Sequence, residues 1–149
     1  MPLDHPQLGP NDVPTYQMSA VPFVTSSLGG LVPNSSAASP LRIRLPSVSR
    51  FVVVHNTGDA PVRVGFTANG VGARGSFDGS GDNRAKDRNY FILSGNQTTG
   101  RLELRCKDLY FLTDISNKTS DVSVLAGVTP ISVTKFPVLT GSSGYEGIG

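Results

Sequence analysis

Apolar and polar residues alternate along much of this 149-residue chain, and the alternation is clearest over residues 41–67. Residues 41–45 alternate Leu and Ile with Arg, residues 51–54 form a Phe-Val-Val-Val run, and alternation resumes over 62–66. A period of two is typical of β-strands with one buried face, and the turn-rich cluster at 56–61 separates the last two strands. The pattern therefore predicts adjoining antiparallel strands. The residues expected to hold their core are Val52, Val54, Val64 and Phe66.

The same period recurs in the second half of the chain. Leu102, Leu104 and Cys106 alternate with charged residues, which predicts one buried and one solvent-facing side. No window has apolar residues at helical spacing over three turns, so helices are not expected. About eight or nine strands at short, even spacing predict an all-β sandwich or barrel, and eight strands in two sheets is the number in a jelly roll. The further strands expected are 21–25, 28–32, 90–93, 101–106, 109–113, 121–126 and 128–133.

Three segments do not follow the strand pattern. Residues 1–20 have proline at four regularly spaced positions, which excludes helix and predicts an extended N-terminal arm. Residues 136–149 are rich in glycine but keep apolar side chains, as expected for a second arm that orders against another surface. One β-domain is expected over 21–135, with residues 69–89 forming a long exposed loop.

The charge of the chain argues against nucleic-acid binding as its main role. The net charge is +2, from 13 basic and 11 acidic residues that are interleaved through the middle of the chain. Strong binding to nucleic acid requires a clustered basic excess, because several phosphates are neutralised at once. The arginines of the strands are expected to form the solvated face of a sheet, and they are Arg42, Arg44, Arg63, Arg101 and Arg105.

No targeting or membrane segment is expected. Residues 1–14 include two acidic side chains, no Lys or Arg and no apolar core, so they do not resemble a signal peptide. No apolar run reaches about 18 residues, so direct membrane insertion is not expected. We expect a soluble chain made in a reducing compartment, where the sequons at Asn34, Asn96 and Asn117 have no role.

Cys106 is the single cysteine, so no internal disulfide can form. It lies on the same side of the predicted strand as Leu102 and Leu104, so we expect a small buried side chain. A cysteine nucleophile would need a histidine base, yet His5 lies in the proline-rich arm and His55 ends a strand. No pair of Cys or His residues has the spacing of a zinc motif. We therefore expect neither a catalytic cysteine nor a metal.

Two glycine-rich segments have the composition, but not the pattern, of a binding loop. Residues 78–83 offer oxygen ligands for calcium, but they lack the glutamate at the twelfth position and the flanking helices of an EF-hand. Residues 69–75 have the glycine density of a phosphate-binding loop without its spacing. No cofactor is expected.

Catalytic arrangements of acidic residues are equally weak in this chain. A Ser-His-Asp triad could include His55 and Asp59, but no Gly-x-Ser-x-Gly segment supplies the nucleophile. No carboxylates have a spacing that forces them together, so we expect that the protein is not an enzyme. The acidic residues considered for such pairs are Asp78, Asp82, Asp87, Glu103 and Asp108.

Five short sequence segments follow one another along the last two thirds of the chain. They are RVGFTANGV at 63–71, NYFIL at 89–93, LEL at 102–104, SVLAGVTPI at 123–131 and GSSGYEGIG at 141–149. Together with the small β-rich core, this layout resembles the penton (vertex) capsid protein of large icosahedral double-stranded DNA viruses. The resemblance spans roughly residues 50–149, and it includes neither residues 1–40 nor the charged part of the long loop.

The resemblance implies a single jelly-roll β-sandwich of about eight antiparallel strands with extended N- and C-terminal arms. It implies a homopentameric ring at each five-fold vertex, in contact with neighbouring major and minor capsid proteins. The protein would be assembled inside the host cell and reside in the virion. The loop 69–89 would point outward or into a seam between subunits.

Two other functions compete with the capsid hypothesis. One is a glycan- or receptor-binding β-sandwich module of a viral fibre or tail, and the other is an enzyme on a β-scaffold. A sugar site favours an exposed aromatic platform, whereas this chain has no Trp. Its tyrosines are scattered along the sequence, at Tyr16, Tyr90, Tyr110 and Tyr145.

Overall fold

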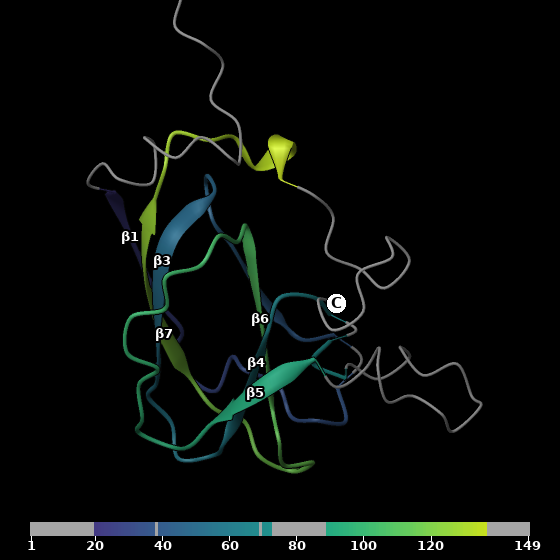
Figure 1. Ribbon diagram of the computed structural model, residues 1–149. Coiled ribbons are helices and arrows are strands. Elements are labelled where there is room, and N and C mark those ends of the chain that lie inside the picture. The colour runs from purple at the N-terminus through teal and green to yellow at the C-terminus, as the bar shows by residue number, and fades with distance from the viewer. Residues whose placement is uncertain (1–19, 38, 69, 73–88, 137–149) are drawn as a thin grey trace, which may run out of the picture.

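The chain is all-β, which confirms the prediction from alternation (Figure 1). The computed structural model describes residues 20–37, 39–68, 70–72 and 89–136, and within these ranges its one helical element is the 3₁₀ helix η1 (Val133–Lys135). Apart from residues 20, 70–72, 89 and 136, the predicted arms and long loop lie outside these ranges. The strands are β1 (Val21–Ser26), β2 (Leu41–Arg44), β3 (Ser49–Asn56), β4 (Val62–Gly65), β5 (Tyr90–Leu93), β6 (Asp108–Thr113) and β7 (Val122–Val128).

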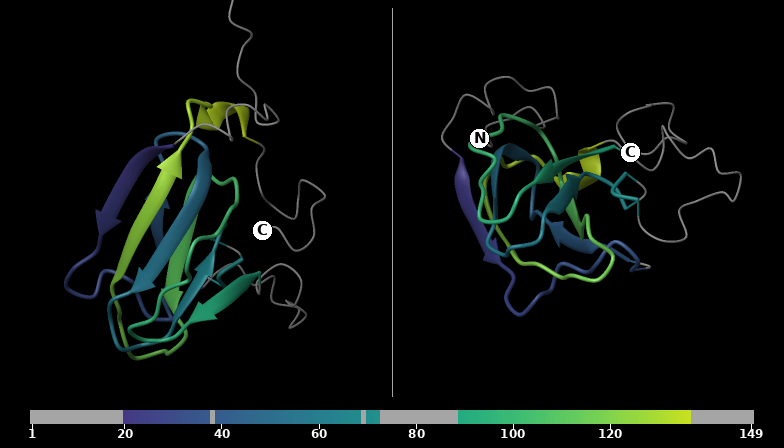
Figure 2. Two further views of the ribbon diagram at one scale, coloured as in Figure 1. Left: turned by 60° about the vertical axis from the view of Figure 1, so that its left-hand side comes forward. Right: turned by 90° about the horizontal axis from the view of Figure 1, so that it is seen from below.

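The strands form two antiparallel sheets that pack as a β-sandwich, with the orders β1-β7-β3 and β2-β6-β4-β5 (Figure 2). Residues 98–106 run beside the other edge of β3, where Val52 and Leu102 exchange backbone hydrogen bonds of 2.9 and 3.0 Å. When this segment is counted as a strand beside β3, both sheets have the strand order of a jelly roll. The prediction of a regular strand over 101–106 was wrong, since within that range only Leu102 forms a bridge, with Val52.

The first four strands of the sequence alternate between the two sheets. The prediction that the strands of residues 41–67 adjoin was wrong, because β3 pairs with β7 whereas β4 pairs with β5 and β6. The turn after Asn56 crosses from one sheet to the other, whereas a hairpin turn would have kept both strands in one sheet. Alternation along a strand identifies which side of the strand is buried, but it does not identify the strand with which it pairs.

Two predicted strand boundaries were also wrong. Residues 28–32 form no strand, since Gly29 and Gly30 have φ of +84° and +76°, and only Val32 forms a bridge, with Ser120. Left-handed backbone interrupts a strand and is accessible to glycine without steric cost. Residues 121–126 and 128–133 do not form two strands, because β7 continues to Val128 between β1 and β3 before the chain turns into η1.

The core lies between the sheets and contains the inward positions that the alternation predicts. Val52, Val54 and Val64 are at most 1% exposed, and Phe66 packs against the same cluster while remaining partly exposed. Burial of each such side chain contributes roughly 1.5–3 kcal/mol. The other buried members of the cluster are Val32, Leu45, Val62, Leu93, Cys106, Leu109, Phe111, Val122, Val124, Ala126 and Val128.

The strands β1 and β5 each lie at an edge of a sheet (Figure 1). The strand β1 ends the three-stranded sheet, and β2 and β5 end the four-stranded sheet. In the described residues, β1 and β5 each pair with a single neighbour.

Candidate functional site

Cys106 lies in the core, as its parity predicts. It is 1% exposed, and its backbone N–H donates to the Ser49 hydroxyl at 2.8 Å. Burial raises the pKa of the Cys106 thiol to about 11. The hydrogen bond with the Ser49 hydroxyl acts in the opposite direction, but its effect on the pKa is smaller. A thiol that is buried and protonated is a poor nucleophile.

We expect Cys106 to react much more slowly in the folded protein than in the unfolded chain. With a pKa of about 11, only about one thiol in 1,000 is ionised at pH 8, and its burial also excludes a bulky reagent. Labelling by an aromatic disulfide at pH 8 should therefore be at least roughly 100-fold slower without urea than in 8 M urea. Equal rates would show that the thiol is accessible. No second cysteine contributes to the signal.

His55 and Cys106 do not form a catalytic pair. Ser49, which bonds to Cys106, begins β3, and His55 lies six residues further along the same strand, or roughly 20 Å away. His55 and Asp59 are both exposed, and no hydrogen bond or ion pair between them is present. His5 lies outside the described residues.

Two of the candidate carboxylates form ion pairs with arginines and not contacts with each other. Asp108 accepts two hydrogen bonds from Arg42, at 3.0 and 3.1 Å, and Glu103 pairs with Arg101 at 2.6 Å. Within the described ranges, no group of three or more His, Cys, Asp or Glu side chains could bind a metal ion together. The remaining candidates, Asp78, Asp82 and Asp87, lie outside those ranges.

A small cleft opens where the end of β2 meets the start of β6. Its volume is about 240 Å³, below the usual range of roughly 300–1,000 Å³ for small-molecule sites. Three of its side chains are basic, but the guanidinium of Arg42 is already paired with Asp108. The cleft is lined by Arg42, Arg44, Leu45, Lys107, Asp108 and Val133.

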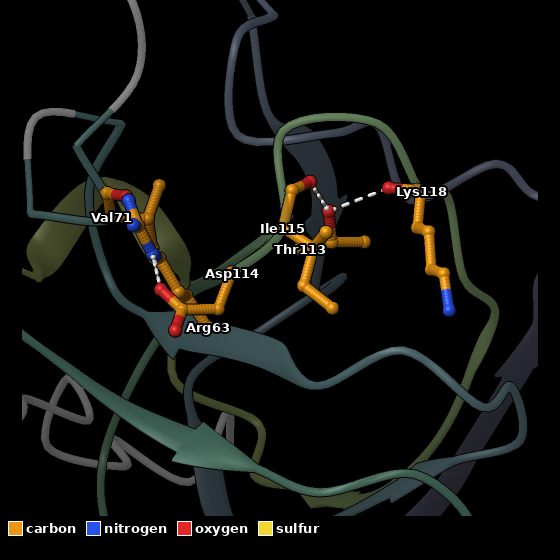
Figure 3. Close-up of polar contacts among 6 residues, drawn as sticks. All are labelled: Arg63, Val71, Thr113, Asp114, Ile115 and Lys118. Carbon is orange, nitrogen blue, oxygen red and sulfur yellow. Dashed lines mark hydrogen bonds and ion pairs between the residues drawn. The ribbon is translucent and has the colours of Figure 1, made fainter.

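Arg63 ties the start of the predicted long loop to the sheet (Figure 3). Its Nε donates to Asp114 at 2.7 Å, and its Nη1 donates to the backbone carbonyl of Val71 at 3.2 Å. The guanidinium also lies 4.8 Å from the ring centroid of Tyr90. The side chain is only 19% exposed, so its prediction as part of a solvated face was wrong. By contrast, Arg42 and Arg101 are 39% and 50% exposed.

Among the described residues, most of the exposed large apolar side chains lie on and beside β1. Val24 is 68% exposed and pairs in register with Leu125 of β7, which is 42% exposed. This surface was missed by the search for reactive residues, although residues 20–41 contain no charged residue, which is a visible signal. Natural edge strands usually carry charge that prevents pairing with another chain. We define the β1 face as Val24, Leu28, Leu31 and Leu125.

Asp121 fixes the turn that presents the two leucines of the β1 face. One carboxylate oxygen accepts from the Leu31 N–H at 3.1 Å and from the Ser27 hydroxyl at 3.0 Å. The other oxygen accepts from the Gly30 N–H at 2.9 Å. The leucines are nevertheless 81% and 57% exposed, so the polar interactions hold the turn while its apolar side chains face outward. These hydrogen bonds therefore hold the turn in one conformation.

The same contacts predict acid sensitivity at Asp121. Burial acts to raise the pKa of this carboxyl, but the hydrogen bonds from residues 27 and 29–31 outweigh it, so the pKa falls below the usual 3.8. The resulting stabilisation is present above pH 3.8 and is lost as the pH falls through the lower folded value. The variant Asp121→Asn should lower the free energy of unfolding at pH 7 by about 1–2 kcal/mol, since one charged acceptor is lost.

Urea unfolding of the two proteins between pH 7 and pH 2.5 tests this expectation. The difference between them should shrink below pH 4, because the wild-type carboxylate becomes protonated. A difference that stays constant down to pH 2.5 would contradict it. Asp59→Asn, at an exposed carboxyl, is the matched control.

No protein-family model, curated protein or solved structure gives a significant match to this chain. Among the described residues, no helix combines the length and the apolar character needed to cross a membrane.

Proposed function

We propose that this chain is a structural capsid protein, the penton subunit that forms a homopentameric ring at the five-fold vertices of an icosahedral double-stranded DNA virus. The β1 face carries the proposal, because a large uncharged surface on a fixed turn is suited to permanent contact with another protein. The jelly-roll strand order supports it, since capsid proteins commonly use this architecture. The segments at 63–71 and 123–131, which resemble penton proteins, include most of β4 and most of β7.

Assembly would remove this surface from water. Each Å² of apolar surface buried contributes about 25 cal/mol, and a preformed turn loses little conformational entropy on contact. The partners under this proposal are other copies of the chain and the neighbouring major and minor capsid proteins. Binding of nucleic acid is no part of the proposed role.

Native mass spectrometry and electron microscopy of the purified protein test the proposal. A ring of five copies should have five times the 15.7 kDa mass of one chain. Antibody labelling of intact particles should then place the protein at the vertices. A monomer at high concentration, absent from particles, would overturn the proposal. Sugar affinity in that monomer would favour the glycan-binding alternative.

Deletion of residues 141–149 is expected to separate folding from incorporation. The last described element, η1, ends at Lys135, so every strand of the sandwich is retained in the truncated chain. We expect its melting temperature to stay within about 3 °C of wild type, while its incorporation into particles falls at least roughly tenfold. Loss of folding would show that the segment belongs to the core. A chain in which residues 141–149 are replaced by a Gly-Ser segment of equal length controls for length.

A further inference from the structure

The cleft between the end of β2 and the start of β6 has positive charge that no acidic side chain balances. Both carboxylate oxygens of Asp108 accept from Arg42, at 3.1 and 3.0 Å, so these two charges neutralise each other. Arg44 and Lys107 also line the cleft, and neither side chain forms a hydrogen bond or ion pair with any described residue. Two basic side chains are therefore left to bind an anionic group.

The size of the cleft limits what that group can be. A volume of about 240 Å³ has room for one side chain and not for a whole small molecule of the usual size. A carboxylate accepts strong, charge-assisted hydrogen bonds from a guanidinium and from an ammonium group. The chemistry of the cleft thus fits a single acidic side chain of a peptide segment.

The 3₁₀ helix η1 determines where the C-terminal part of the chain leaves the sandwich. Val133 of η1 lines the cleft, and Ile131, just before η1, is fully buried. The Ile131 carbonyl accepts from the Val48 N–H at 3.0 Å, which fixes this part of the chain beside the start of β3. Residues 137–149 follow Phe136, which is only three positions after Val133, so they are joined to the sandwich next to the cleft.

The sequence of this last segment complements the charge of the cleft. Its single charged residue is Glu146, which comes thirteen positions after Val133. A flexible chain of that length has a root-mean-square span of roughly 20 Å. Such a short tether gives the carboxylate an effective concentration in the millimolar range at the cleft, far above that of another copy in a micromolar solution. Charge and tether length both favour Glu146 of the same chain.

We propose that Arg44 and Lys107 bind the Glu146 carboxylate of their own chain, so that residues 137–149 dock in the cleft. The inference goes beyond the proposed function and does not depend on whether the chain forms a ring. The strand β2 is an edge strand that pairs only with β6 among the described residues. A segment docked beside it restricts the access of other chains to its open edge.

Zero-length crosslinking of the full chain tests the inference. A carbodiimide joins the Glu146 carboxyl to the Lys107 amine as an amide, with loss of water, when the two groups are in contact. Lys118 is the reference amine, because it is exposed in the turn at the other end of β6. Mass spectrometry of the digest should give at least roughly ten times more Lys107–Glu146 than Lys118–Glu146 product. On a denaturing gel the product should keep the 15.7 kDa mass of one chain.

The substitution Arg44→Gln separates binding from proximity, because it removes a charge from the cleft and leaves both crosslinked groups in place. Arg44 is exposed, so the melting temperature should stay within about 3 °C of wild type. The yield of the Lys107–Glu146 product should fall at least roughly fivefold. About 1 M salt should lower the wild-type yield too, since it screens exposed ion pairs. The matched control Lys118→Gln removes a charge far from the cleft and should leave the yield unchanged.

Each other result would overturn the inference. Equal yields at Lys107 and Lys118, or an unchanged yield in Arg44→Gln, would mean that the cleft does not bind the segment. A product with the mass of two chains would mean that Glu146 binds another copy. Links from Lys107 to Asp4 or Asp12 in place of Glu146 would assign the cleft to the N-terminal segment. The penton function is tested separately, by the mass of the assembled protein.

Discussion

Replacement of Asn56 by alanine is expected to lower the free energy of unfolding by about 4 kcal/mol, because buried polar groups then lose their partners. The Asn56 side chain is fully buried, and its amide donates to the backbone carbonyls of Ala60, Leu93 and Ser94 at 2.8–3.2 Å. Its carbonyl oxygen accepts from the Gly58 N–H at 3.1 Å. One side chain thereby joins the end of β3 to the end of β5 in the opposite sheet.

The variant Asn56→Asp separates shape from hydrogen bonding. It has nearly the same volume, but an ionised carboxylate has no donor for the three carbonyl oxygens that surround it. Its stability should therefore fall further as the pH rises from 4 to 7, since ionisation of a carboxyl in this setting opposes folding. Urea unfolding gives the values. The exposed Asn117→Ala serves as control, and a loss at Asn56→Ala no larger than at Asn117→Ala would contradict this account.

The buried Asn56 side chain also explains why the prediction that neighbouring strands of residues 41–67 adjoin was wrong. The cluster at 56–61 contains the residues of a tight turn, and such a turn commonly joins adjacent strands of one sheet. Here the Asn56 amide reaches carbonyls at Ala60 and in the distant β5, so the turn spans both sheets. Nothing in the local composition records that long-range contact. In contrast, the side of a strand on which a side chain lies follows from the local alternation of residues. For this reason the burial of Cys106 and Val64 was correctly predicted.

The candidate surface could be predicted only in part, for a related reason. The absence of charge over 20–41 and 89–100 is readable in the sequence, but it is equally compatible with a buried segment. The structure places Val24 and Ile92 at exposed positions on two edge strands, and this depends on the pairing of β1 with β7 and of β5 with β4. The role of Asp121 required the same knowledge, since its carboxylate holds backbone groups some 90 residues earlier.

Gly95 is the site of the second large effect, and the substitution Gly95→Ala should destabilise the fold by about 3 kcal/mol. An added Cβ would meet three backbone atoms of Asp59, with the carbonyl carbon at 2.8 Å and the Cα at 2.9 Å. Backbone atoms cannot move aside as the end of a flexible side chain can. The turn after β5 would have to separate from the turn after β3, at the place where Asn56 binds the Ser94 carbonyl.

The variant Gly100→Ala is the control, because it changes a glycine whose role is a positive φ and not a close contact with another segment. Gly100 has a φ of +69° and no atom within 4 Å of an added Cβ, so its substitution should cost only about 1 kcal/mol of backbone strain. Chemical denaturation of both variants gives the comparison. Because Gly95 and Asn56 act on the same pair of turns, the double variant should lose less stability than the two single losses added together. Equal losses for Gly95→Ala and Gly100→Ala would mean that the two turns are not in close contact, and the corner that joins the sheets would then have to depend on Asn56 alone.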